Sequence, residues 1–205
     1  MYINNMVLGK RNIIKYTNFS GGATGADTVF ELDGEKYEIS TVAYSFNGHN
    51  TTSKNRYILS QDELDEGFKH IEIANKTLKR DIDHISKYVK NLLSRNWFQV
   101  KNAEAIFAIG RIKNKMGIRR EVDGGTGWAV QIGIDNNKKV YVFDQNTNKW
   151  YEWCKDQEPC DKFILLKYIP PLTENFAGIG TRELNENGKK AIQYLLKNNF
   201  NFLEP

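Results

Sequence analysis

The sequence has few cysteines, no long apolar run and no export signal. Its 205 residues include two cysteines, Cys154 and Cys160, which are too few for a disulfide framework or a metal-binding knuckle, so we interpret them as free thiols. No apolar stretch approaches the roughly 20 residues that cross a bilayer. Residues 1–5 lack the basic and apolar segments of a signal peptide. We therefore expect a cytoplasmic protein (in the host cytoplasm if the gene is viral) with no membrane partner.

A strong charge of one sign is also missing. The formal net charge is +4, and the basic residues are scattered apart from residues 111–115 and 119–120. Nucleic-acid-binding domains concentrate more positive charge on one face, so no nucleic-acid partner is predicted. No repeat, linker or low-complexity segment divides the chain, and its length suits one domain. We predict a single nucleotide-binding domain over residues 1–205.

Two common nucleotide-binding signatures are absent. The chain has no G-x-G-x-x-G fingerprint with an acidic residue about twenty positions on, and no Walker sequence. These absences argue against a general NAD dehydrogenase and against a P-loop ATPase. We predict no cofactor and no metal.

Three short glycine-rich stretches are present instead. The middle one, Asp-Gly-Gly-Thr-Gly-Trp, covers residues 123–128, and related stretches cover residues 20–27 and 177–183. Glycine permits tight turns and lets a ligand approach backbone N–H groups, and a following helix presents its positive end to anions. Each stretch lies between a strand-like and a helix-like segment. Together they predict a site for a phosphate or another anion.

Apolar patterns place these stretches in an α/β fold. We expect strands at residues 12–19, 37–44, 102–110, 139–144, 150–154 (at the sheet edge) and 175–177, and helices at residues 23–32, 60–78, 83–97, 128–134 and 185–196. Residues 111–120 are expected to form a polar loop. Alternating strands and helices predict a mostly parallel sheet. Ligands lie at the carboxyl ends of such strands, so the three stretches should meet at one edge.

Several side chains near the stretches have both a ligand-binding and a structural interpretation. Arg182 either pairs with a phosphate or forms a structural salt bridge. Trp128 either stacks on a base or packs in the core, and Asp27 either contacts ligand or stabilises its helix. Arg95 either reaches an anion or is a solvated arginine at a helix end, and His49 either contacts ligand or is an incidental loop residue. The predicted ligand-binding residues are Ser20, Gly21, Gly22, Gly25, Asp27, Gly124, Gly125, Thr126, Gly127, Trp128, Gly178, Gly180, Thr181 and Arg182.

These stretches resemble motifs of the SLOG superfamily of Rossmann-like proteins, near its YpsA-like and lysine decarboxylase-like (LOG) branches. Residues 20–27 resemble the S-G-G-A-x-G-A-D loop, residues 103–108 the strand before the GGT loop, and residues 124–127 that loop. Residues 177–183 resemble the G-(S/T)-R element, which comes first in ordinary members. The chain therefore resembles the circularly permuted YpsA-related branch. The resemblance implies a permuted Rossmann-like three-layer sandwich, a nucleotide-derived ligand and a homo-oligomer.

The same alignment bears on catalysis. LOG-type phosphoribohydrolases resemble P-G-G-x-G-T-x-x-E, which puts Asp123 at the proline, Trp128 at the threonine and Gln131 at the glutamate. Glutamine cannot supply an ionised carboxylate to stabilise an oxocarbenium-like transition state or to activate water. The departure argues against that activity and leaves Glu183 and Asp27 as candidate catalytic or ribose-binding carboxylates.

Three functional hypotheses follow. The first is a protein that senses or sequesters a nucleotide-derived signal. The chain is rich in Asn, Lys and Ile, as in AT-rich genomes such as those of phages, so one such role is a phage protein acting against host nucleotide signalling. The second is a hydrolase of a nucleotide, and the third is a structural or interaction protein with a vestigial site. The sequence favours the first.

Overall fold

A computed structural model describes residues 15–200. The strands in that range are β1 (Thr17–Ser20), β2 (Ser40–Ser45), β3 (Arg56–Ile58), β4 (Ala105–Gly110), β5 (Ile112–Lys115), β6 (Ile118–Val122), β7 (Lys139–Asp144), β8 (Lys149–Cys154), β9 (Lys162–Leu165) and β10 (Asn175–Gly180). The helices are α1 (Ala26–Glu35), α2 (Gln61–Leu78), α3 (Lys87–Ser94), α4 (Asn96–Asn102), α5 (Thr126–Asp135) and α6 (Glu186–Phe200). The first residues of the strand expected at 12–19 lie outside the described range.

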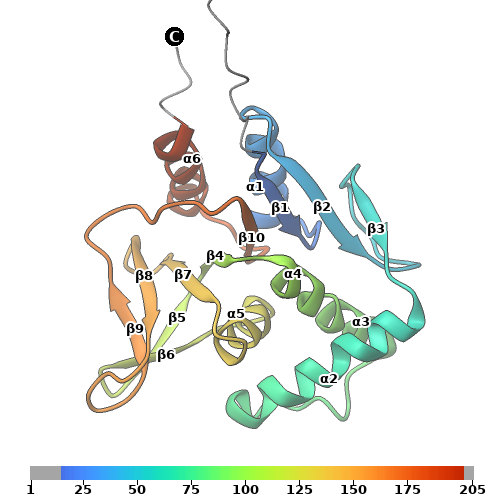
Figure 1. Cartoon of the computed structure of the whole chain (residues 1–205). Helices are drawn as coiled ribbons and strands as arrows, with labels where there is room; N and C mark the ends of the chain where they lie inside the picture. The colour runs from blue at the N-terminus through green and yellow to red at the C-terminus, as the bar shows by residue number, and fades with distance from the viewer. Residues whose placement is uncertain (1–14, 201–205) are drawn as a thin grey trace, which may run out of the picture.

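Eight strands form one mostly parallel sheet in the order β3-β2-β1-β10-β4-β7-β8-β9 (Figure 1). Neighbours from β3 to β7 pair in parallel, whereas β8 and β9 add antiparallel strands at one side. From β1 the chain adds β2 and β3 toward one edge of the sheet. From β4 it adds β7, β8 and β9 toward the other edge. Strand β10 fills the centre between these two halves. The predicted α/β fold with a mostly parallel sheet is confirmed.

The central strand β4 explains the three-layer arrangement. All six of its residues are buried, and their side chains alternate between two cores because successive residues of a strand face opposite sides. Ala105, Phe107 and Ile109 pack toward α1 and α6, whereas Ile106 and Ala108 pack toward α2 and α5. Figure 1 shows α1 and α6 together on one face of the sheet and α2 to α5 on the other. The fold is a Rossmann-like sandwich.

Local sequence signals explain some helix boundaries and miss others. The capping box predicted at the start of α2 is present, since Ser60 accepts from the N–H of Glu63 and Glu63 accepts from the N–H of Ser60. The single helix expected at residues 83–97 is instead two helices, α3 and α4, with Arg95 between them. No glycine or proline marks this break. At Gly67, α2 packs so closely that an added Cβ would lie 2.3 Å from the Ser94 carbonyl oxygen.

Two other expectations differ from the structure. The polar loop expected at residues 111–120 contains the antiparallel hairpin of β5 and β6, which turns at Met116 and Gly117, both with positive φ. Strand β8 is not at the edge of the sheet, because β9 pairs outside it. No helix within residues 15–200 combines the length and apolarity needed to span a bilayer.

Candidate functional site

A cavity of about 430 Å³ lies at the carboxyl ends of β1, β10 and β4. Its walls come from the segments that follow these strands, from α3 and α4, and from the first turn of α5. All three glycine stretches contribute to it. The predicted residues that line it are Asp27, Gly124, Gly125, Thr126, Gly180, Thr181, Arg182 and Glu183.

The other predicted residues lie behind the cavity wall. Ser20 is fully buried, donates to Glu31 Oε1 at 2.5 Å and accepts from the N–H of Gly22 at 3.0 Å. The hydroxyl of Thr51 donates a hydrogen bond to the carbonyl oxygen of Gly22. These contacts stabilise the stretch rather than leave it free for a ligand. The predicted residues outside the lining are Ser20, Gly21, Gly22, Gly25, Gly127, Trp128 and Gly178.

The first stretch is closed by contacts with the end of β10. Gly25 has a φ of 103°, and an added Cβ would lie 2.4 Å from the carbonyl oxygen of Thr181. The first N–H of α1, at Ala26, donates to that same oxygen at 3.1 Å. Asp27 accepts from the N–H of Gly180 at 2.9 Å and from that of Ala23 at 3.3 Å. Protein groups therefore occupy most of the positive end of α1.

The second stretch, before α5, is open. Gly124 and Gly125 are exposed, and a Cβ added at either would meet nothing within 4 Å. Helix α5 has no side-chain cap. Within residues 15–200, no acceptor is bonded to the N–H groups of Gly125 and Thr126. Unpaired N–H groups at a helix start attract anions, and this stretch presents such groups at the cavity lining.

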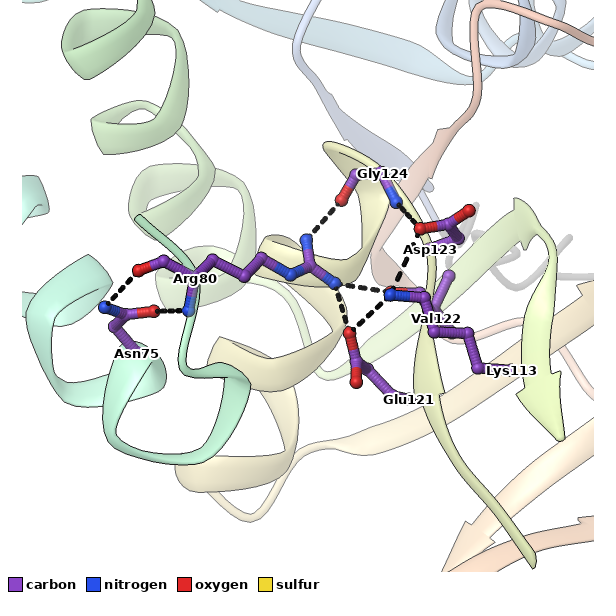
Figure 2. A network of polar contacts seen from close by, with 7 residues as sticks. All are labelled: Asn75, Arg80, Lys113, Glu121, Val122, Asp123 and Gly124. Carbon is purple, nitrogen blue, oxygen red and sulfur yellow. Dashed lines mark hydrogen bonds and ion pairs between the residues drawn. The ribbon is translucent and has the colours of Figure 1, made fainter. Parts of the chain in front are cut away.

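Arg80 holds the open stretch in position from outside the cavity (Figure 2). Its guanidinium donates to the carbonyl oxygens of Gly124 at 2.6 Å and Val122 at 2.9 Å, and pairs with Glu121 at 2.8 Å. The side chain of Asn75 in turn bonds the backbone of Arg80 at both its N–H and its carbonyl. The sequence offered no signal for this arrangement, because Arg80 is far from residue 124 in the chain.

Trp128 and Gln131 do not line the cavity. Trp128 is buried in the core with the Arg80 guanidinium 5.3 Å from its ring centre, so of its two interpretations the structure has the packed one. Gln131 is also buried and donates to Asp135 Oδ1 at 2.8 Å. The position that aligns with the LOG glutamate is therefore outside the site.

Three buried polar side chains form the inner end of the cavity: Asp27, Arg95 and Gln99. The Arg95 guanidinium donates to the carbonyl oxygens of Leu92 and Tyr44. No carboxylate oxygen of the described residues lies within 4.0 Å of it. The sequence raised Arg95 as a possible anion contact but gave no reason to single out Gln99.

Burial shapes the titration of this region. It raises the pKa of Asp27 from 3.8 to about 6, against the opposing influence of Arg95 and of two backbone N–H groups. The pKa of His49 is lowered to about 4 by burial and by the positive charges of Arg95, Arg182 and Arg56. His49 is therefore neutral at pH 7 and lies outside the lining, bonded to Ser45.

The outer rim carries two more arginines. Arg111 pairs with Glu183 at 2.9 Å, and both side chains are well exposed. Arg182 is exposed and has no carboxylate within 4.0 Å among the described residues, so the salt-bridge alternative raised for it is not present there. The cavity lining therefore carries three arginines, Arg95, Arg111 and Arg182, together with three carboxylates, Asp27, Asp123 and Glu183.

Comparisons of the chain with protein-family models, with curated proteins and with solved structures find no match. The likeness to the SLOG superfamily thus rests on the motifs, whereas the Rossmann-like fold rests on the structure. Within the described part of the chain, no three His, Cys, Asp or Glu side chains are grouped to hold a metal ion.

Proposed function

We propose that this cavity binds a nucleotide or a nucleotide-derived ligand, in a protein that senses or sequesters it. One observation carries the proposal: the open start of α5 faces the same cavity as Arg95, a buried cation with no carboxylate partner among the described residues. Fixed N–H groups at a helix start bind phosphate, and the Arg95 guanidinium offers N–H donors to another part of the same ligand.

In this proposal the phosphate binds at the open stretch. The N–H groups of Gly125 and Thr126 donate to it, and Thr181 and Arg182, which also line the cavity, are further donors. An apolar wall of Val89, Leu92 and Ala129 supplies a surface for the base.

The relation to the circularly permuted SLOG branch is part of the proposal. Strand β10, which carries the G-(S/T)-R-like element, is late in the chain yet central in the sheet. Moving it ahead of β1 would give a chain that starts at the centre and builds outward, as in ordinary Rossmann-like sheets. The expected homo-oligomer stays a prediction, which the molar mass measured by light scattering tests.

The first experiment is mass spectrometry of any ligand released from the purified protein, followed by calorimetric titration with nucleoside 5′-monophosphates. Gly125→Asp is the informative variant, because residue 125 has an α-helical φ of −61° and open space for a side chain. The new carboxylate occupies the phosphate position, so we expect roughly a 100-fold loss of affinity with an unchanged or higher melting temperature.

The matched control is Ser40→Asp, which adds the same charge at an exposed position at the amino end of β2, on the opposite edge of the sheet. It should bind like the wild type. If no nucleotide co-purifies or binds, the proposal fails and the hypothesis of a structural protein with a vestigial site replaces it.

A nucleotide hydrolase is the second candidate, and one observation favours it. Asp27 lines the cavity and its pKa of about 6 suits general acid–base catalysis near neutral pH. Incubating the wild type and Asp27→Asn with the nucleotides, and measuring free base and released phosphate, separates the two functions. Binding without any product formation by the wild type rules the hydrolase out.

A further inference from the structure

Three polar groups from two parts of the chain, α1 and the start of α4, converge at the inner end of the cavity. Asp27 Oδ2, Arg95 Nη1 and Gln99 Nε2 each lie within 2.8 Å of the point that a Cβ of Gly21 would occupy. Their residues are only 4%, 6% and 2% exposed. Glycine at position 21 is required here, because any side chain would displace these groups.

The hydrogen bonds of this cluster are incomplete. The side chain of Gln99 has no hydrogen-bond partner within residues 15–200. It lines the cavity, although the residue is almost entirely buried. Arg95 has five N–H donors and uses two of them on carbonyl oxygens. Each carboxylate oxygen of Asp27 accepts one backbone N–H and can accept another. Because buried polar groups are nearly always paired, the open donors and acceptors of this cluster are available to a polar group inside the cavity.

We propose that Asp27, Arg95 and Gln99 form a subsite for the 2′- and 3′-hydroxyls of a ribose. Each hydroxyl can donate to the Asp27 carboxylate and accept from Arg95 or Gln99. This subsite rests on the proposed function, since it assumes that the phosphate of the same molecule is bound at Gly125 and Thr126.

The mixed charge of the cluster decides between a diol and a second phosphate. A phosphate at Arg95 would lie against the carboxylate of Asp27, and like charges in a buried site repel strongly. A neutral diol meets both side chains without that cost and satisfies donors and acceptors together. The side chain of Arg95 also remains within reach of Asp27 as a compensating charge.

The test is calorimetric titration of the wild-type protein with ribonucleoside 5′-monophosphates and with their 2′-deoxy and 3′-deoxy analogues. We expect each deoxy analogue to bind at least ~10-fold more weakly, because it leaves a buried donor or acceptor unpaired. This comparison needs no variant, so it does not depend on any substitution being tolerated.

Gln99→Met then assigns the preference to this cluster. The variant should weaken ribonucleotide binding and leave deoxynucleotide binding almost unchanged, so that the preference shrinks. Gln131→Met is the matched control, because Gln131 is a buried glutamine outside the cavity; it should keep the full preference.

The outcomes separate the subsite from the proposed function. Equal binding of ribo- and deoxynucleotides by the wild type overturns the subsite and leaves the nucleotide site standing. A preference that survives in Gln99→Met also overturns it as assigned. A protein that binds none of these nucleotides overturns both proposals.

Discussion

The glycine-rich stretches before α1 and α5 have similar sequences, but the first is packed against other segments and the second is exposed. In residues 20–27, glycines allow close packing: Gly25 meets Thr181, and Asp27 and Thr181 bond the N–H groups around the start of α1. In residues 123–128, Gly124 and Gly125 face open space and the N–H groups of Gly125 and Thr126 have no partner in the described structure.

This difference shows that a glycine-rich stretch before a helix has two distinct uses. One use brings two backbones together, and the other leaves a backbone accessible to a ligand. The sequence pattern is common to both, whereas the neighbours that decide between them come from distant parts of the chain. The following substitutions test the comparison, beginning with the largest expected effect.

Alanine at the two stretches should give contrasting stabilities. Gly25→Ala forces a side chain into a positive φ and against the Thr181 carbonyl, so we expect the free energy of unfolding to fall by about 3 kcal/mol or more. Gly125→Ala has a helical φ and open space, so it should change stability by less than about 1 kcal/mol. Urea unfolding of both variants measures this, and similar losses would contradict the comparison.

The closed stretch should also make stability depend on pH through Asp27. The unfolded carboxyl loses its proton near pH 3.8, whereas the folded one keeps it to about pH 6. The folded state therefore binds more protons between these values, and the contribution of Asp27 to stability falls as pH rises from 4 to 6, by about 3 kcal/mol in all. Above pH 6 the contribution stays constant.

Other groups titrate in the same window, so the measurement is a difference. His49, with its pKa lowered to about 4, gives the opposite slope, because the folded state then resists protonation. Subtracting the unfolding free energy of Asp27→Asn from that of the wild type at each pH removes this shared part. A difference that stays flat, or that rises with pH, would show that burial does not raise this pKa.

The open stretch should depend on Arg80 for its shape. Arg80→Met removes the bonds to Gly124, Val122 and Glu121, so we expect a loss of about 1–3 kcal/mol in stability and roughly a tenfold loss in nucleotide affinity. Arg120→Met is the control, since Arg120 is exposed and lies outside the cavity lining. Urea unfolding and calorimetric titration of both variants test whether the bonds of Arg80 support both stability and nucleotide affinity.

The smallest effect is expected at the rim. Glu183→Gln frees Arg111 from an exposed ion pair, and such pairs contribute about 0–1 kcal/mol. Stability should barely change, and nucleotide affinity should rise by up to a few fold because one negative charge leaves the rim. Titration at low and at high salt checks the cause, since added salt should remove the gain.

Local patterns in the sequence predicted the class of fold well. The apolar run of β4, the capping box of α2 and the alternation of strands and helices are set by neighbours in the chain, and all three are present. The break at Arg95 and the added strand β9 were missed, because tertiary packing decides both. The short exposed strand β3 offered no apolar pattern to detect.

The site was predictable only where its elements follow strands. Thr126, Thr181 and Arg182 could be assigned to one sheet edge from chain order alone, and all three line the cavity. Gln99 lies on α4, within a helix segment that looks unremarkable in sequence, and Arg80 lies two residues after the end of α2. Gln99 matters because its side chain is unpaired within the described structure, and Arg80 because it bonds residues 122 and 124. Both depend on contacts between distant residues, which sequence periodicity does not show.

The central position of β10 has a consequence for how the molecule forms. Its neighbours, β1 and β4, both precede it in the chain, so their facing edges stay unpaired until residues 175–180 are available. Unpaired edges invite wrong pairing, and such distant contacts form slowly. The cavity has walls on both sides of β10 and cannot exist before it inserts. A ligand of this cavity binds only molecules in which β10 has paired with β1 and β4. Its binding energy therefore stabilises that pairing.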